Sequence, residues 1–288
     1  MTAFHTPVPL RWSDLDVQGH VNNVAALDFT QEARARFMAE SPAPALLVDG
    51  SVLVSQRIEF LRPLVLSDEP VDVGLGATKV GAARFSMAYQ LRQNGELCAR
   101  VATVMCPFDF ENQRVRRLTD MERECLKAIS VPEEPWRKMS DTQLDGRGEP
   151  IMLAPRWSDQ DRFGHVNNVR ILDWVQEARI ESTSSIDPAM ARRGQLSSND
   201  PDADLWLVAR QDVDYIHQLA WRPEPYCVVT APLRVGATSV TLGCEIIDPL
   251  EGSTRVRCTT VLVHGGASGR PSPLPESTRE AMTARLVV

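Results

Sequence analysis

The sequence has no excess of positive charge, no long hydrophobic run and no leader-like start. Its formal net charge is −7 at pH 7, which argues against nucleic acids and anionic membranes as partners, because both bind basic surfaces. No stretch approaches the roughly 20 apolar residues that a membrane span requires. The first residues, MTAFHTPVPLRW, lack the basic and apolar regions of a signal peptide. We therefore expect a cytoplasmic protein without a membrane span.

Cysteine motifs are also missing. The chain contains no C-x-x-C pair and no cluster of Cys and His with zinc-type spacing, so no metal site is expected. Most of its cysteines lie in apolar, strand-like runs, where buried reduced thiols are expected rather than disulfides. The six cysteines are Cys98, Cys106, Cys125, Cys227, Cys244 and Cys258.

What the sequence does contain is an internal repeat. Residues 11–34 read RWSDLDVQGHVNNVAALDFTQEAR, and residues 156–179 read RWSDQDRFGHVNNVRILDWVQEAR, so that 17 of 24 positions are identical. Both copies carry the pattern W-S-D-x-D-x-x-G-H-V-N-N. The spacing of the copies far exceeds that of solenoid repeats and indicates a duplicated domain. Two domains also agree with a length of 288 residues.

Both halves predict the same order of elements. Residues 24–39 contain no Gly or Pro and place apolar side chains three and four positions apart, which is typical of a helix with one buried face. Four strand-like runs and a short helix follow in each half. The polar residues 131–150, which include several Pro and Gly, indicate a linker. We therefore expect domains at 1–130 and 151–288.

Several boundaries have local signals. Residues 9–12 predict a short strand, and Asn94-Gly95 predicts a hairpin. Thr119 with Glu122, and Ser277 with Glu280, match the capping box that opens a helix. The expected long strands are 52–61, 70–80, 83–92 and 97–108, then 205–216, 226–235, 239–247 and 254–263.

This order makes each unit a helix followed by an antiparallel sheet. Such a helix buries its apolar face against the concave face of the sheet. A single unit leaves an edge strand unpaired, and pairing two units side by side removes that edge. The fold class is therefore α+β, with two similar units.

The motif and this order resemble the hot-dog fold thioesterases. The D-x-x-G-H-V opening before a central helix is similar to the 4-hydroxybenzoyl-CoA thioesterase-like group, and RWSDLDVQGHVNN is similar to a segment of acyl-ACP thioesterases. The resemblance covers both halves. It implies a tandem (double) hot-dog, each half a long central helix wrapped by an antiparallel sheet. The chain would then be an intrachain pseudo-dimer, and hot-dog proteins commonly associate further into homo-oligomers.

The resemblance also implies the site. Thioester hydrolysis needs a carboxylate that attacks or activates water, and a donor for the developing oxyanion. By position, the carboxylates are Asp16 and Asp161, and the donors are the backbone N–H groups of Asn23 and Asn168 at the helix starts. His20 and His165 join them as candidate catalytic residues. Candidate substrate-binding residues are Gly19, Gly164, Asn22, Asn167 and Arg62.

Each of these residues also has a purely structural interpretation. An Asp or Asn before a helix is commonly a cap or a turn residue. The sequences of the expected strands, such as 52–61 and 207–216, differ widely between the two halves. The similarity is therefore retained locally, in the motif, which favours a function for Asp16 and Asp161. The histidines are as well explained by hydrogen bonds to a neighbouring loop. We interpret Asp14 and Asp159 either as solvated turn carboxylates or as residues that orient the motif. On the helices we expect helix-surface or interface pairs at Asp28, Glu32, Asp173 and Glu177.

The sequence departs from related patterns. Plant-type acyl-ACP thioesterases carry Asn two residues after the Asp, where this chain has Gln18 and Phe163. Their acidic residue and Cys on the following strand are also missing, which disfavours that mechanism. The hydratase branch of the fold has a Pro between an Asp and a His five positions apart, and this chain has neither feature.

The leading hypothesis is therefore hydrolysis of an acyl-CoA thioester to the free acid and CoA, without a metal or organic cofactor. Acyl-ACP is the alternative substrate, although an acidic carrier would need a basic docking face on a chain of charge −7. A non-catalytic acyl-ligand-binding hot-dog protein is the third hypothesis. The Asp in both halves counts against it, because a binder needs no carboxylate beside a thioester carbonyl.

Overall fold

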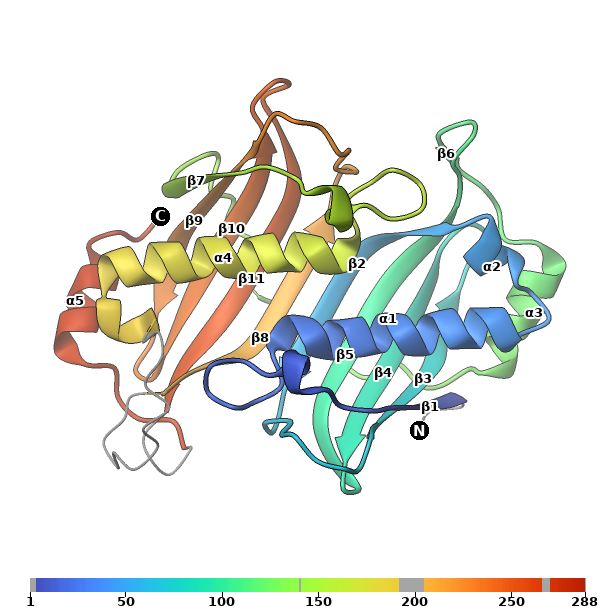
Figure 1. The fold of residues 1–288 in the computed structure, drawn as a ribbon, viewed down its shortest axis with the longest axis horizontal. Coiled ribbons are helices and arrows are strands. Elements are labelled where there is room, and N and C mark those ends of the chain that lie inside the picture. Colours follow the sequence, from blue (N-terminus) through green and yellow to red (C-terminus); the bar gives the residue numbers. More distant parts are fainter. Residues whose placement is uncertain (1–3, 140, 192–204, 266–269, 288) are drawn as a thin grey trace. The chain divides into compact units, whose positions relative to one another are not determined.

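The computed structural model describes residues 4–139, 141–191, 205–265 and 270–287 (Figure 1). The chain divides into two compact units, Met1–Arg137 and Lys138–Val288. Each unit contains one long helix and one antiparallel sheet, so the α+β class is confirmed. Among the described residues, no helix combines the length and the hydrophobicity that a membrane span demands.

In the first unit, the sheet has the strand order β1-β3-β4-β5-β2, and the short strand β6 pairs with β5. Helix α1 packs against β1 and β3. It extends one residue beyond the expected helix, residues 24–39, at each end. The elements are β1 (Phe4–Val8), α1 (Asn23–Glu40), α2 (Ala45–Val48), β2 (Ser51–Phe60), β3 (Val71–Val80), β4 (Phe85–Gln93), β5 (Glu96–Asp109), β6 (Arg114–Val115) and α3 (Asp120–Ala128), with a 3-10 turn at Trp12–Asp14.

The second unit repeats this topology, with the strand order β7-β9-β10-β11-β8. Helix α4 packs against β7, β9 and β10. The duplication seen in the sequence is thus a duplication of the fold. The elements are β7 (Glu149–Leu153), α4 (Asn168–Ile186), β8 (Leu205–Tyr215), β9 (Tyr226–Val235), β10 (Ser239–Asp248), β11 (Ser253–Gly265) and α5 (Glu276–Thr283), with 3-10 turns at Trp157–Asp159 and Pro188–Ala191.

The core of the first unit lies between α1 and the sheet. The helix buries side chains at three- and four-residue spacing, and the strands bury alternate residues on the face toward it. Strand β4 shows this pattern most clearly, because Phe85, Met87, Tyr89 and Leu91 are all almost completely buried. The spacing that predicted the helix therefore results from burial on one face.

Two local predictions are confirmed and two are wrong. Asn94-Gly95 forms the β4–β5 turn with both residues at positive φ, and Thr119 and Glu122 form the capping box of α3. The strand expected at 9–12 is wrong: the first strand ends at Val8, because the Asp14 carboxylate accepts the N–H of Arg11 (2.7 Å) and closes a 3-10 turn. The capping box at Ser277 is also wrong, since Pro275 occupies the N-cap of α5 without a side-chain cap.

The last residue of each repeat copy is an arginine buried under its helix. Arg34 is 6% exposed and donates to the hydroxyl of Tyr89 (3.4 Å). Counted from the Val-Gly-Ala shared at 80–82 and 235–237, the position of Tyr89 falls on Cys244 in the second unit. Arg179 therefore lacks this partner, and its Nη1 atom is buried without a hydrogen bond among the described residues. Burial lowers the pKa of Arg179.

We expect Arg179→Met to leave the free energy of unfolding unchanged or to raise it, because the substitution removes a buried charge that has no counter-ion. Arg34→Met should instead cost about 1 kcal/mol, since it leaves Tyr89 without its donor. Chemical denaturation of both variants checks this. The interpretation is wrong if Arg179→Met is the less stable of the two.

Asp248, at the end of β10, connects three segments of the second unit. Its buried carboxylate accepts hydrogen bonds from Arg222 (2.8 and 3.0 Å), Arg255 (2.7 Å) and the N–H of Leu250 (3.0 Å). Burial alone would raise the pKa of Asp248, but the hydrogen bonds from the two arginines outweigh it and lower the pKa to about 2. The ionised form is therefore the one that the fold stabilises.

Because this pKa is lower in the folded state than the ordinary value of 3.8, the carboxylate contributes stability above about pH 4 and loses it as the pH falls toward 2. We expect wild type to lose about 2 kcal/mol more than Asp248→Asn between pH 5 and pH 2. Urea denaturation across this pH range measures the difference. Parallel pH profiles of the two proteins would contradict the assignment.

Candidate active site

The repeated motif folds into a tight hairpin ahead of the long helix. In the first unit, Asp16 donates its N–H to the carbonyl of His20 (2.8 Å), Leu15 pairs with Val21, and Asn22 donates to the carbonyl of Asp14 (2.8 Å). In the second unit the equivalent bonds join Asp161 to His165 (2.7 Å) and Asn167 to Asp159 (2.8 Å). The hairpin therefore places the acidic residues alongside the residues that begin the helix.

A glycine in left-handed conformation makes this hairpin possible. Gly19 has φ +76° and Gly164 has φ +79°, a region that residues with a Cβ rarely adopt. Each donates its N–H to the carbonyl of the Asp three residues earlier, at 3.1 and 3.2 Å. This turn geometry explains both glycines. Their predicted contact with substrate stays a prediction.

One oxygen of each motif carboxylate holds the hairpin. Oδ1 of Asp16 accepts the N–H groups of Gln18 (2.8 Å) and His20 (3.1 Å). Oδ1 of Asp161 accepts those of Phe163 (2.8 Å) and His165 (3.1 Å). Within the described residues, Oδ2 of each carboxylate accepts no hydrogen bond and meets no cation. Each half-buried aspartate thus has one oxygen fixed and one oxygen available.

The residues predicted to act as donors lie at the start of each helix. The Oδ1 atoms of the N-cap residues Asn22 and Asn167 accept the N–H of the second helical residue, both at 2.9 Å. The N–H groups of Asn23 and Asn168, which come first in each helix, find no acceptor in the part of the chain that the structure describes. The side-chain Nδ2 of Asn23 is also buried without a partner. Unpaired donors at a helix start favour a negatively charged group.

The other predicted residues have the following environments. His20 is half-buried, and no hydrogen bond engages its ring within the described ranges. Arg62 forms an exposed ion pair with Glu96 (2.8 Å). Of the two interpretations of Asp14 and Asp159, these hydrogen bonds favour the orienting one, because each carboxylate accepts the N–H of the arginine three residues earlier. The expected helix-surface pairs are confirmed for Glu32 with Arg36 and Asp173 with Arg170.

The residues that hold the segment next to each hairpin carry no signal in the sequence. Val65 forms a β-bridge with His20. The buried side chain of Gln93 accepts the N–H of Val65 (3.0 Å) and donates to its carbonyl (2.7 Å). In the second unit Ala220 pairs with His165, and the hydroxyl of Tyr226 donates to the carbonyl of Ala220 (3.0 Å). No local pattern marks Gln93 or Tyr226, since the contacts lie between distant parts of each chain half.

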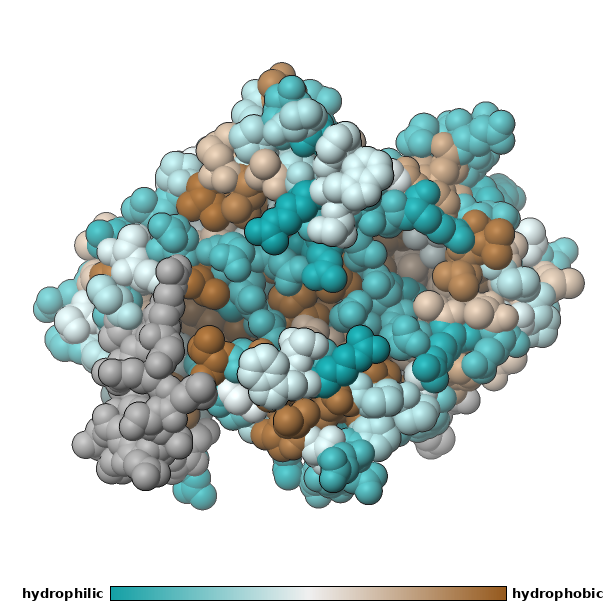
Figure 2. All heavy atoms as spheres, in the orientation of Figure 1, coloured by the Kyte–Doolittle hydropathy of each residue, from teal (hydrophilic) through white to brown (hydrophobic). Residues whose placement is uncertain are grey.

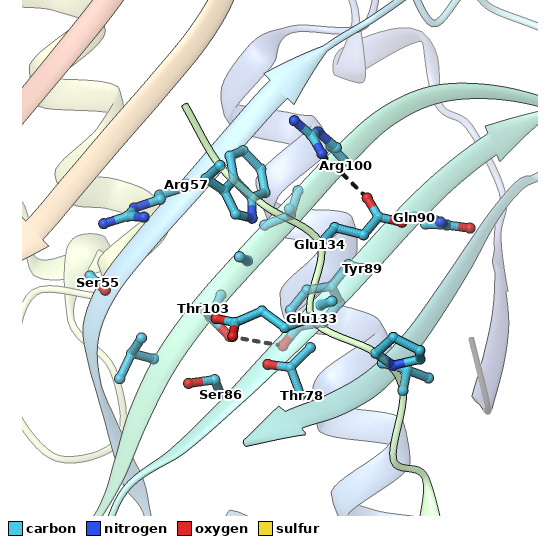
Figure 3. A pocket seen from close by; sticks show the side chains of 17 residues that line it. Ser55, Arg57, Thr78, Ser86, Tyr89, Gln90, Arg100, Thr103, Glu133 and Glu134 are labelled. Carbon is cyan, nitrogen blue, oxygen red and sulfur yellow. Dashed lines mark hydrogen bonds and ion pairs between the residues drawn. The ribbon is translucent and has the colours of Figure 1, made fainter. Parts of the chain in front are cut away.

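The first unit also contains two pockets that the motif does not line. One, of about 140 Å³, lies on the outer face of the sheet beneath residues 131–136. In Figure 3 this segment crosses the strands, and a dashed line joins Arg100 to Glu134. Arg100 also pairs with Glu59 (2.6 Å) and stacks on Trp136. The second, of about 510 Å³, is mainly apolar and lies beside Phe4, Phe37 and Ile129.

A family model described as the thioesterase-like superfamily matches the chain twice, at residues 10–134 and 155–282. The two matches cover most of the sequence and contain both copies of the motif. The chain belongs to the thioesterase-like superfamily. The resemblance inferred from the motif is thus confirmed for both halves.

Proteins related in sequence are consistent with this family. The uncharacterized protein YsmA of Bacillus subtilis is 29% identical over 132 residues, which cover 43% of this chain and 85% of that protein. A chloroplastic palmitoyl-acyl carrier protein thioesterase of Cuphea hookeriana is 28% identical over 90 residues, or 29% of this chain and only 22% of that protein.

Solved structures show the same fold. A Lactobacillus plantarum protein named as an oleoyl thioesterase gives a TM-score of 0.69 at 14% identity, covering 90% of this chain and 95% of its own. A 12:0-ACP thioesterase of Umbellularia californica gives 0.66 at 16% identity, covering 93% and 97%. The tandem hot-dog fold predicted from the sequence is therefore confirmed.

Two substitutions distinguish the contribution of Asp16 as a hydrogen-bond acceptor from that of its charge. Asp16→Ala removes the acceptor of two backbone N–H groups, so we expect a loss of about 1–2 kcal/mol in unfolding free energy. Asp16→Asn keeps a carbonyl oxygen at Oδ1 and should lose less than half of that. Thermal denaturation compares the two variants. Equal destabilisation by both would show that the charge, not the hydrogen-bond acceptor, holds the hairpin.

Proposed function

We propose that the chain hydrolyses acyl-CoA thioesters to a free acid and CoA, with Asp16 and Asp161 as the reactive carboxylates. The observation that carries this proposal is an arrangement repeated in both units. Among the described residues, one carboxylate oxygen has no partner, and the hairpin that holds it leads into a helix whose first N–H has no acceptor. Membership of the thioesterase-like superfamily supports thioester hydrolysis as the reaction.

The chemistry follows from these two groups. Oδ2 of the aspartate removes a proton from a water molecule while the water oxygen bonds to the thioester carbonyl carbon. The N–H of Asn23 or Asn168 stabilises the negative charge on the carbonyl oxygen. The C–S bond then breaks, and the CoA thiolate takes the proton. Direct attack by the carboxylate, followed by hydrolysis of the resulting anhydride, uses the same groups.

The remaining predicted residues have supporting roles in this proposal. His20 and His165 lie opposite the aspartates in each hairpin, where an imidazole can assist the proton transfers. Gly19, Gly164, Asn22 and Asn167 shape the turn that a substrate carbonyl would approach, and Arg62 is a candidate partner for a phosphate. We also propose that the duplication makes one chain the counterpart of a two-subunit hot-dog assembly.

A second candidate is an acyl-ACP thioesterase. The sequence similarity to the Cuphea hookeriana protein, whose name specifies an acyl carrier protein substrate, favours it. The net charge of −7 disfavours an acidic carrier. A non-catalytic acyl-binding protein is the remaining alternative, and the same assay distinguishes all three.

The test is thiol release from a series of acyl-CoA and acyl-ACP substrates by wild type, Asp16→Asn, Asp161→Asn and the double variant. Loss of the general base lowers kcat by about 10²–10⁴-fold, so the double variant should be nearly inactive, and each single variant should reveal the share of its own site. Asp173→Asn, which removes a carboxylate from the helix surface, is the matched control.

Three outcomes decide between the candidates. A double variant as active as wild type would contradict the assignment of the two aspartates as the reactive carboxylates. Release from acyl-ACP alone would make the protein an acyl-ACP thioesterase. Acyl-CoA binding measured by calorimetry, without turnover of any substrate, would identify a binding protein.

A further inference from the structure

Each copy of the motif exposes a tryptophan to solvent. Trp12 is 81% exposed and Trp157 is 75% exposed, although tryptophan is among the more buried residue types on average. On the face shown in Figure 2, hydrophobic side chains reach the surface in separate clusters among hydrophilic ones. These two tryptophans are different from such scattered apolar residues, because they occupy the same position of a duplicated sequence.

Packing does not explain why both copies keep this residue. At these exposures neither ring fills a core. The two halves differ at many positions outside the motif, so shared ancestry alone does not account for the match. Trp12 makes no ring contact within the described residues, and Trp157 meets only the edge of Trp221, with centroids 5.4 Å apart and planes at 84°. Each therefore leaves aromatic surface available for stacking.

An unpaired arginine precedes each tryptophan. Arg11 and Arg156 are exposed, and no ion pair engages either guanidinium within the described ranges. Other arginines of the first unit, such as Arg62, Arg100 and Arg116, do have an acidic partner. On a protein of net charge −7, an unpaired cation beside an exposed aromatic ring suits a ligand that carries both phosphate and a flat heterocycle.

The same turn ties this pair to the proposed catalytic hairpin. The carbonyl of Trp12 accepts the N–H of Leu15 (3.2 Å), and the carbonyl of Asp14 accepts the N–H of the N-cap Asn22 (2.8 Å). Four residues of chain separate Trp12 from Asp16, a span of at most about 14 Å. A flexible substrate arm can therefore reach the carboxylate while its other end rests on the tryptophan.

We propose that Arg11 with Trp12, and Arg156 with Trp157, bind the nucleotide head of CoA. The adenine stacks on the indole, and the guanidinium pairs with phosphate oxygens. This inference rests on the proposed acyl-CoA hydrolysis and names the part of each unit that would recognise the carrier. Phosphopantetheine on a carrier protein has no adenine, so such a site selects CoA over acyl-ACP.

The test compares the same acyl group on CoA and on pantetheine, which lacks the nucleotide. Stacking of a base on an aromatic side chain contributes about 1–3 kcal/mol, which corresponds to roughly 5- to 150-fold in affinity. The Trp12→Ala, Trp157→Ala double variant should raise KM for acyl-CoA at least about 5-fold. Its kcat, and its KM for acyl-pantetheine, should equal those of wild type.

Further variants separate stacking from charge and from structure. The Trp12→Phe, Trp157→Phe double variant should retain most of the affinity for acyl-CoA, because phenylalanine keeps an aromatic face. The Arg11→Gln, Arg156→Gln double variant should raise KM for acyl-CoA and leave KM for acyl-pantetheine unchanged. Trp136→Ala, which removes a tryptophan outside the motif, is the control. Equal losses on both substrates, or no loss on either, would overturn the proposal, as would a loss confined to acyl-ACP.

A binding measurement keeps this inference separate from the proposed function. Adenosine 3′,5′-bisphosphate carries the adenine and two of the three phosphates of the CoA head, without a thioester. Calorimetry should show that wild type binds it and that the double tryptophan variant binds it at least about 5-fold more weakly. Binding in a protein that hydrolyses no thioester would support the head site while rejecting the enzyme, and an absence of binding would reject the head site alone.

Discussion

The hydrogen bonds from one carboxylate oxygen to two backbone N–H groups are the constraint on which each candidate site depends. Asp16 and Asp161 use Oδ1 to close a hairpin over a left-handed glycine. Because that oxygen is fixed, the direction of the whole carboxyl group is fixed as well, and Oδ2 keeps one orientation although no described residue donates a hydrogen bond to it. A group positioned in this way needs little reorganisation during a reaction. The same contact thus serves folding and the proposed chemistry.

The hairpin also determines where the helix begins. Asn22 and Asn167 are paired with the opposite side of the hairpin through their backbone and cap the helix through their side chains. The cap satisfies the second N–H of the helix and leaves the first unpaired. A capping residue usually only stabilises a helix end. Here its place in the hairpin additionally determines which donor stays available for a negatively charged group.

The motif and its surroundings differ in how far sequence predicts them. Helix α1, the long strands, the Asn94-Gly95 turn and the orienting role of Asp14 follow from local patterns, because spacing, turn chemistry and capping act over a few residues. The hydrogen bonds of Gln93 to Val65, of Arg34 to Tyr89 and of Arg222 to Asp248 join residues that are far apart in sequence. The failed predictions at 9–12 and Ser277 have a local origin instead, since a carboxylate three residues away and a proline two residues away outweighed the expected pattern.

Because the domain is duplicated, equivalent residues of the two units can be compared within one molecule. Where both copies keep a residue that is structurally necessary, such as Gly19 and Gly164, retention needs no function. Where the units differ, as at Arg179 with Cys244 in the position of Tyr89, the second unit tolerates a buried guanidinium nitrogen that has no hydrogen-bond partner in the part of the chain that the structure describes. Trp12 and Trp157 belong to neither group, because they are retained and are not buried. The retention in both copies of a residue that the fold does not require, four positions before the aspartate of the hairpin, supports the proposed contact with the nucleotide head of CoA.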